Sequence, residues 1–254
     1  MIFEQCTSCF QESTGKEMSL NANSTFTPDK IQTVLHQLET SADKYPFWQK
    51  LKEICRYCAS QSVNLYIDAE YSHLQPVVRA LTLALMKAGN QERGAKFVIY
   101  NTYQCYLQDC QAHLQEDIQI AKELHFSNWG CKLVRGAYLQ SETQNFQQGK
   151  LARFPLHRSY EETNSSYNSA LKLLMGHLKE MKHLYLTIAT HNLESVEKGL
   201  QHLAENDALK TQVNFAQING LADPLSLALA QKKVRVLKLL PCGSVQEVLP
   251  WLGR

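Results

Sequence analysis

The chain has 254 residues, enough for one large domain with its own hydrophobic core. Its hydrophobic content of 44%, charged content of 20% and net charge of +2 are ordinary for a globular protein, and they argue against nucleic acid as its main partner. No apolar run reaches the roughly 18 residues that a membrane span needs. The first residues resemble neither a signal peptide nor a transit peptide, so import into an organelle would need a leader that this sequence does not show.

Two pairs among the eight cysteines have the C-x-x-C spacing of zinc sites, Cys6 with Cys9 and Cys55 with Cys58. Four thiolates at that spacing would permit one zinc ion. The alternative places Cys55 and Cys58 on the apolar face of a helix near Trp48, where a free thiol behaves as a small hydrophobic side chain. We favour this second interpretation, and the scattered remaining cysteines suit a reducing compartment.

The first part of the chain predicts a disordered end followed by two helices. Residues 1–26 are polar and show no hydrophobic periodicity. Thr27 followed by Pro28 is typical of a helix start, because threonine can cap the first turn and proline fits its first position. A second helix is expected over residues 46–60, and residues 27–254 are expected to form one domain.

From residue 63 onward, short apolar runs alternate with helical patterns. The predicted strands are 63–67, 96–100, 131–134, 185–189, 213–216 and 234–240. The predicted helices are 75–89, about 107–124, 160–182, about 196–203, 224–231 and 245–252. Residues 140–158 are polar and are expected to form a long irregular loop. Such alternation predicts a parallel sheet built from right-handed βαβ units.

A closed (β/α)8 barrel needs eight strands, and this pattern provides six. The segment before residue 61 shows helical rather than strand periodicity, so it does not provide the other two. The sequence therefore predicts an α/β fold of the TIM-like barrel type that is incomplete.

Polar residues follow the predicted strands, at the barrel edge where parallel strands end and active sites lie. They are Asp68, Glu70, Gln104, Lys132, Arg135, His191, Asn192, Gln217 and Asn219. Two cations at one strand end, Lys132 and Arg135, suit an anionic cofactor. They could equally form ion pairs with Asp68 or Glu70. These two acids could hold a metal with His191, but nothing in their spacing requires it, and we predict no metal.

Several of these segments are carried by longer motifs. They are Asp68 to Tyr71 with Gln75-Pro76, Asn101 to Leu107, Lys132 to Tyr138, Glu162-Thr163-Asn164 with Tyr167, Thr190-His191-Asn192, and Pro241-Cys242-Gly243 with Glu247 to Pro250. In these motifs the sequence resembles the proline dehydrogenase family, in particular its eukaryotic mitochondrial proline and hydroxyproline dehydrogenases. The resemblance runs in register from about residue 62 to residue 254.

The resemblance implies a distorted TIM barrel that binds FAD and oxidises L-proline to Δ1-pyrroline-5-carboxylate. A hydride would pass from C5 of the proline ring to flavin N5, and the electrons would pass on to a membrane quinone. Hydroxyproline is the alternative substrate. By the same resemblance the protein is expected in mitochondria, where peripheral association with the inner membrane would bring it to the quinone.

The resemblance also assigns roles to residues. Lys132 matches the basic residue beside flavin N5, and Asp68 matches an acid at the floor of the site that pairs with a substrate-side lysine. The remaining matches are to cofactor contacts. Gln104 matches the glutamine at the isoalloxazine, backbone lining the cofactor is expected at Val134, Gly136 and Ala137, and the ribityl–pyrophosphate part is expected at Thr190, His191 and Asn192.

Three positions depart from the family pattern. Leu239 stands where the family has a tyrosine or a smaller polar residue at the substrate. Arg254 matches the first arginine of a pair that clamps the substrate carboxylate, and the sequence given stops before the second. The family's substrate-side lysine, on an earlier strand, has no counterpart. We therefore expect a chain truncated at both ends; the alternative is a catalytically impaired paralogue that binds flavin.

Overall fold

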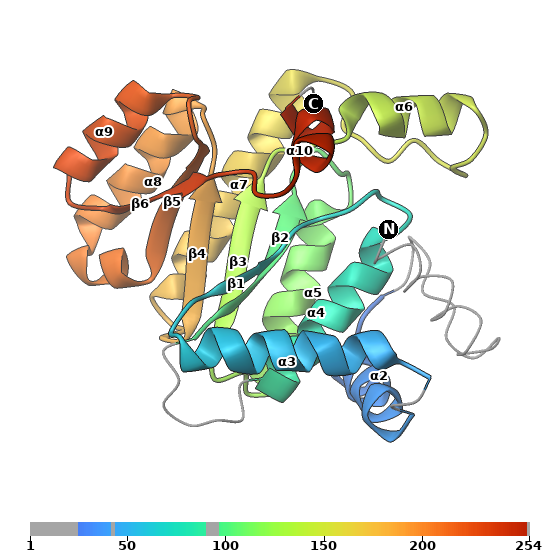
Figure 1. The fold of residues 1–254 in the computed structure, drawn as a ribbon. Helices are drawn as coiled ribbons and strands as arrows, with labels where there is room; N and C mark the ends of the chain where they lie inside the picture. Colours follow the sequence, from blue (N-terminus) through green and yellow to red (C-terminus); the bar gives the residue numbers. More distant parts are fainter. Residues whose placement is uncertain (1–24, 42–43, 90–96, 253–254) are drawn as a thin grey trace.

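The computed structural model describes residues 25–41, 44–89 and 97–252 (Figure 1). Residues 1–24 of the predicted disordered end, the cysteine pair Cys6 and Cys9, and Arg254 lie outside these ranges. The prediction is wrong for Phe26, whose side chain is buried against Arg79.

A single parallel sheet of six strands organises the described chain, and each strand pairs with the next one in sequence. The strands are β1 (Leu65–Ile67), β2 (Ile99–Gln104), β3 (Trp129–Val134), β4 (Leu184–Ala189), β5 (Val213–Ile218) and β6 (Arg235–Leu239). This order without any crossing-over is the strand order of a β/α barrel. All six predicted strands are present.

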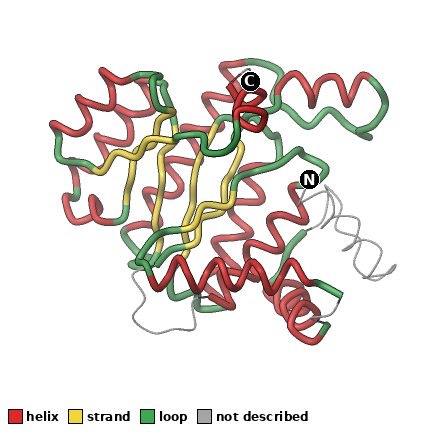
Figure 2. The backbone as a smooth tube through the Cα atoms, in the orientation of Figure 1, coloured by secondary structure: helices red, strands yellow, loops and turns green. Residues whose placement is uncertain are grey.

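Helices follow each strand, and two further helices, α2 and α3, precede β1 and lie at the bottom of the view (Figures 1 and 2). They are α2 (Pro28–Thr40), α3 (Pro46–Ser60), α4 (Gln75–Gly89), α5 (Cys110–Glu123), α6 (Leu139–Gln147), α7 (Tyr160–Leu178), α8 (Leu193–Glu205), the 3-10 helix η2 (Asp207–Thr211), α9 (Asp223–Gln231) and α10 (Val245–Leu252). As predicted, Thr27 caps α2, its hydroxyl accepting a hydrogen bond from the Lys30 amide at 3.3 Å.

Side chains of strands that are not neighbours meet across the concave face of the sheet. The Tyr66 hydroxyl of β1 lies 3.0 Å from the Thr187 hydroxyl of β4. The Asn214 amide of β5 donates to the Tyr100 hydroxyl of β2 at 3.4 Å. The rings of Tyr66 and Tyr100 stack with their centres 4.2 Å apart. This polar layer inside the curl brings the ends of β1 to β5 toward one another.

Two strands, β2 and β5, run further at their carboxyl ends than predicted, and both extensions carry polar residues. Asn101, Thr102 and Gln104 lie within β2, which is buried along its whole length, and Gln217 lies within β5. Polarity suggested that these strands had already ended. Buried hydrogen bonds explain the difference for Thr102 at least, since its hydroxyl donates to the carbonyl of Ile67 on β1 at 2.8 Å.

The prediction of an irregular loop over residues 140–158 is wrong for its first half, which forms α6. This helix has no apolar stripe for sequence reasoning to detect. It is held by the buried side chain of Glu142 and by an edge-on contact between Phe146 and Phe154, whose ring centres are 5.4 Å apart. Tertiary contacts rather than periodicity therefore define this helix.

Cys55 lies in the hydrophobic core and Cys58 is half-buried beside it, as the non-metal interpretation expects. Burial raises the pKa of the Cys55 thiol to about 12, so this sulfur stays protonated at neutral pH.

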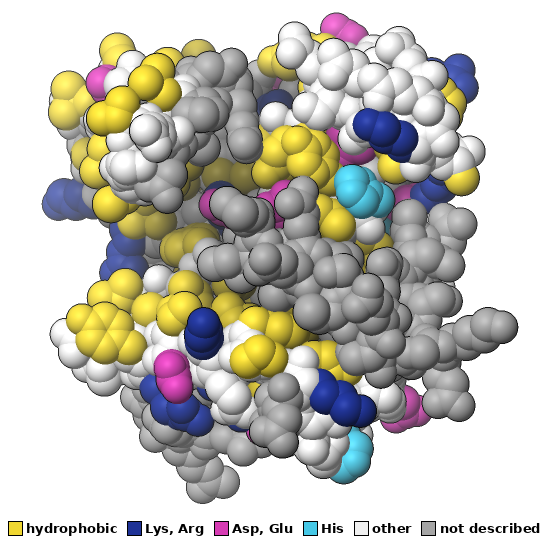
Figure 3. Space-filling model, turned by 45° about the vertical axis from the view of Figure 1, so that its right-hand side comes forward, with side chains coloured by type: hydrophobic (Ala, Val, Ile, Leu, Met, Phe, Trp, Pro, Cys, Tyr) yellow, Lys and Arg dark blue, Asp and Glu magenta, His cyan; other side chains and the backbone are white. Residues whose placement is uncertain are grey.

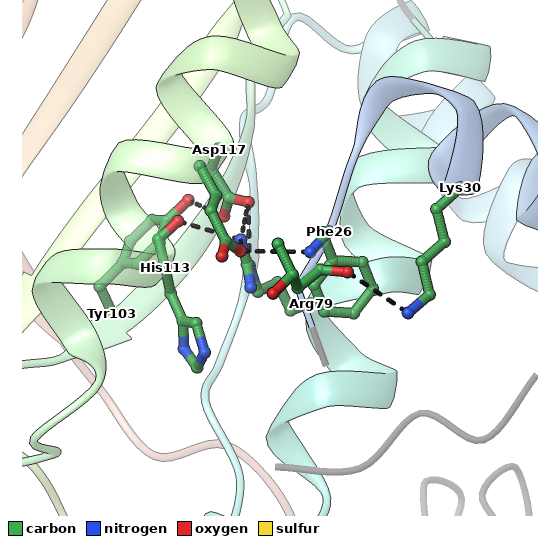
Figure 4. Close-up of polar contacts among 8 residues, drawn as sticks. Phe26, Lys30, Arg79, Tyr103, His113 and Asp117 are labelled. Carbon is green, nitrogen blue, oxygen red and sulfur yellow. Dashed lines mark hydrogen bonds and ion pairs between the residues drawn. The ribbon is translucent and has the colours of Figure 1, made fainter. Parts of the chain in front are cut away.

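A buried ion pair ties α4, α5 and the start of the described chain together (Figure 4). The Arg79 guanidinium, 2% exposed, donates to Asp117 at 2.6 Å and to Glu116 at 2.8 Å. The Tyr103 hydroxyl donates to the other oxygen of Asp117 at 2.6 Å. The ring of Phe26 lies 4.5 Å from the guanidinium carbon and covers it. Both oxygens of the Asp117 carboxylate therefore accept hydrogen bonds, one from Arg79 and the other from Tyr103.

Replacing Arg79 by methionine should lower the free energy of unfolding by about 3–5 kcal/mol, because it leaves the Asp117 carboxylate buried without a cation. Urea unfolding of R79M and K198A would measure this. Lys198 pairs with Glu194 at an exposed site, so K198A should cost less than about 1 kcal/mol. Equal costs for the two variants would contradict the proposed weight of the buried pair.

His113 lies in α5 beside this cluster, where burial and the positive charge of Arg79 lower its pKa from the usual 6.5. As the pH falls below 6.5, the unfolded chain binds a proton that the folded protein still excludes. The free energy of unfolding should therefore decrease until the pH passes the lowered pKa of the folded state. In urea titrations across pH, H113Q should flatten this part of the profile, and H36Q at an exposed histidine is the matched control.

Candidate functional site

Lys132 and Asp68 form an ion pair at the carboxyl ends of the strands. The Lys132 ammonium lies 2.5 Å from an Asp68 oxygen, and its side chain is 14% exposed while that of Asp68 is 71% exposed. The ammonium also lies 6.0 Å from the centre of the Tyr66 ring. Lys132 comes from β3 and Asp68 follows β1, so the ion pair spans β2, which lies between these two strands. One of the two predicted rim ion pairs is therefore present, and the partner of Asp68 here is Lys132.

Arg135 does not take part in an ion pair within the part of the chain that the structure describes. Its three nitrogens donate to Asn164 at 2.8 Å, Thr190 at 2.6 Å and Ser195 at 3.0 Å. Its guanidinium carbon lies 4.4 Å from the centre of the Tyr167 ring. Arg135 thus joins the end of β3 to α7, to the end of β4 and to the first turn of α8. The sequence did not indicate these helix partners, because polar residues on a helix usually face solvent.

The turn after β3 exposes backbone at Gly136 and Ala137. Gly136 has φ +148°, and a Cβ there would lie 2.4 Å from the ring of Tyr106. Only glycine fits this conformation and this contact without displacing the ring. The turn therefore leaves Gly136 and Ala137 exposed after the strand that carries Lys132.

Gln104 is buried between the segment after β1 and the turn after β3. Its side chain is 3% exposed, its amide nitrogen donates to the Glu70 carbonyl at 2.8 Å, and its oxygen accepts from the Ala137 amide at 3.2 Å. Both polar ends are thus used to join the segment after β1 to the turn after β3. The carbonyl of Val134 likewise accepts from the Cys105 amide at 2.9 Å. Gln104 and Val134 support the turn, whereas Gly136 and Ala137 present it.

The segment Thr190-His191-Asn192 begins α8. The buried Thr190 hydroxyl accepts hydrogen bonds from Arg135 and from the Asn192 amide, and the Asn192 side chain caps the helix by accepting from the Ser195 amide at 3.0 Å. His191 accepts from the Ile218 amide at 3.0 Å, and partial burial together with the charge of Lys238 lowers its pKa. The segment therefore combines a neutral imidazole with a helix N-terminus, which favours anions.

Leu239 is the last residue of β6 and is 42% exposed. Its carbonyl accepts from the Asn219 amide at 3.0 Å, which ties the ends of β5 and β6 together. Helix α10 follows at the same edge of the sheet (Figure 1). In the space-filling view, a recess shows hydrophobic side chains together with acidic and basic ones (Figure 3).

No group of three or more His, Cys, Asp or Glu side chains within residues 25–41, 44–89 and 97–252 could hold a metal ion. In the same ranges, no helix is both long enough and apolar enough to cross a bilayer.

Known proteins that resemble the chain decide its family. The sequence pattern of the family described as proline dehydrogenase matches residues 2–254. The chain belongs to the proline dehydrogenase family. Hydroxyproline dehydrogenase of Xenopus laevis is 36% identical over 209 residues, which are 81% of this chain and 44% of that protein. Mitochondrial proline dehydrogenase 1 of Homo sapiens is 33% identical over 214 residues, which are 81% of this chain and 34% of that protein. The chain thus spans less than half the length of these curated relatives.

Solved structures of proline utilization A resemble the fold. The protein of Bradyrhizobium japonicum (mutant D779W) matches with a TM-score of 0.71 at 19% identity over 89% of this chain and 21% of that one. The protein of Corynebacterium freiburgense matches with a TM-score of 0.69 at 18% identity over 98% of this chain and 29% of that one. These likenesses confirm the predicted fold, an incomplete TIM-like barrel.

Gly136 should not tolerate a side chain. Alanine there must displace the Tyr106 ring and adopt a strained φ, so G136A should lower the free energy of unfolding by about 1–3 kcal/mol. Gly176 is an exposed position within α7 with open space around it, so G176A should raise stability by about 0.5–1 kcal/mol. Thermal unfolding of both would show the opposite signs; a stabilised G136A would contradict the geometry of the turn.

Proposed function

We propose that this chain forms the flavin-binding and substrate-binding part of a proline dehydrogenase. It would bind FAD and oxidise L-proline to Δ1-pyrroline-5-carboxylate. Proline would lose a hydride from C5 and the proton from its nitrogen. The Lys132–Asp68 pair is the observation that carries the proposal, because it puts a cation at the strand ends of a barrel whose family performs this chemistry.

The chain's own residues fit FAD. Gly136 and Ala137 expose backbone without a side chain in the way, and Lys132 lies close by in sequence and on the same strand end. The N-terminus of α8, with His191 exposed in front of it, suits a pyrophosphate. Gln104 would act behind the turn rather than on the ring, because both its polar ends are taken.

When bound, FAD would supply the two-electron acceptor for the hydride. The ammonium of Lys132 would stabilise the negative charge that develops beside it on reduction, a charge that water stabilises less well than a preorganised cation. Asp68 would hold that ammonium in place through the ion pair and would partly neutralise its charge until substrate binds. The Asp68 side chain is largely exposed, so substrate can reach the ion pair from solvent.

The substrate is proposed from the relatives and from Leu239. Relatives act, by their names, on proline and on hydroxyproline. Leu239 offers an aliphatic surface at the end of β6 and no group that would bind a hydroxyl, which favours L-proline. We further propose that Arg254 binds the substrate carboxylate, that the electrons pass to a membrane quinone, and that the protein works in mitochondria at the inner membrane, as several relatives are named mitochondrial.

The visible spectrum of the purified chain, supplied with FAD and then with L-proline without oxygen, tests the proposal. A flavin spectrum that bleaches supports proline oxidation. If hydroxyproline bleaches the flavin faster than L-proline does, hydroxyproline is the substrate instead. A bound flavin that neither substrate bleaches would favour the non-catalytic paralogue. If no flavin binds, the proposal for this chain is wrong.

Lys132→Ala should reduce the rate of flavin reduction on the order of a hundredfold while changing the dissociation constant for FAD less than tenfold, because the charge acts mainly on the reduced state. Stopped-flow reduction and flavin fluorescence titration measure the two quantities. K198A, at an exposed lysine on α8, is the control. Equal losses of binding and of reduction in K132A would count against this role.

A further inference from the structure

Glu142 is fully buried, at 0% exposed, although it lies in the first turn of the otherwise polar helix α6. Both its oxygens accept hydrogen bonds from one residue 70 positions earlier. The backbone amide of Ser72 donates at 2.5 Å and the Ser72 hydroxyl donates at 2.8 Å. Such a bidentate contact fixes both the backbone and the side chain of Ser72.

Within the described ranges the Glu142 carboxyl group takes part in no ion pair, and its two side-chain hydrogen bonds come from Ser72. Burying a carboxylate without a cation is costly unless its oxygens are hydrogen-bonded. The helix dipole at the start of α6 offsets part of that cost. A buried carboxyl group whose two oxygens both accept hydrogen bonds from Ser72 points to a specific task of this contact.

Ser72 belongs to the segment that carries Asp68. This segment, residues 68–74, joins β1 to α4 and meets the turn after β3 at several further points. The Tyr71 and Tyr138 rings lie 4.4 Å apart, and the Tyr138 hydroxyl lies 3.5 Å from the Ala69 carbonyl. The side-chain amide of Gln104 donates a hydrogen bond to the Glu70 carbonyl. Of these contacts, only the one with Glu142 uses a charged group.

We propose that Glu142 is a positioning residue: by holding Ser72 it fixes the segment 68–74 against α6 and sets where Asp68 meets Lys132. β1 has three residues and lies at one edge of the described sheet, so its own strand pairing gives the segment after it little support. The Glu142 carboxyl group, on α6, supplies that support through its two hydrogen bonds with Ser72. The consequence for flavin reduction rests on the function proposed above, whereas the clamp itself does not.

The test compares E142Q, S72A and S72T with wild type in the full chain, and Q144A, exposed on the same helix, is the matched control. Glutamine keeps the size of Glu142 but turns an N–H group toward one of the Ser72 donors. In E142Q, amide hydrogen exchange over residues 68–74 should accelerate at least tenfold, whereas β2 should exchange as in wild type. Q144A should change neither. Unchanged exchange over 68–74 in E142Q would overturn the clamp.

A second readout reports on Lys132 without flavin. Trace labelling with acetic anhydride, followed by mass spectrometry, should modify Lys132 several-fold faster in E142Q and in S72A than in wild type, with Lys198 as internal reference. S72T keeps the hydroxyl and should restore the wild-type rate. Faster exchange without faster labelling would show that the clamp does not set the ion pair, and would overturn the positioning role.

Flavin reduction is the third readout. At saturating L-proline the reduction rate should fall about tenfold or more in E142Q, with a smaller change in KM, because misplacing a catalytic group by about 1 Å costs up to a hundredfold. A normal rate in E142Q together with faster labelling would overturn the link to catalysis. If wild type does not reduce flavin, the proposed function fails, and exchange and labelling still decide the clamp.

Discussion

The contacts across the concave face of the sheet are the constraint on which the site depends. Tyr66, Tyr100, Thr187 and Asn214 come from four strands and meet inside the curl. A flatter sheet would separate β1 from β4 and would break these contacts. Burial raises the pKa of Tyr66 and of Tyr100, so both hydroxyls stay protonated as hydrogen-bond donors at neutral pH. The polar layer is thus a structural element of the site as well as of the core.

The two cations at the end of β3 have separate tasks, although they stand three positions apart. Lys132 points to the inside of the curl and remains partly open, with one carboxylate as partner. Arg135 points outward, and its guanidinium is held by three hydrogen bonds and by the ring of Tyr167. Since successive side chains of a strand alternate between its faces, an odd spacing separates them. The fixed guanidinium organises the start of α8, and the ammonium remains available for chemistry.

Much of the fold could be predicted because the parallel strands are short apolar runs separated by amphipathic helices. Prediction failed where tertiary contacts replace periodicity. β2 continues through Asn101 and Thr102 because both its faces are buried, and α6 forms around one buried carboxylate. Within the site, the strand-end rule located Asp68, Lys132 and the turn at Gly136. It could not show that Gln104 faces inward, nor that Glu142 and Ser72 meet, because 70 residues separate this pair.

The arginine cluster has a practical consequence for expression design. Phe26 lies at the beginning of the described chain, yet its ring covers the buried guanidinium of Arg79 and its amide donates to Glu116 at 3.3 Å. An affinity tag joined upstream of residue 25 leaves that cover in place. A deletion that removes Phe26 would expose the buried Arg79–Asp117 ion pair to water. Shortened versions of this protein should therefore begin before that residue.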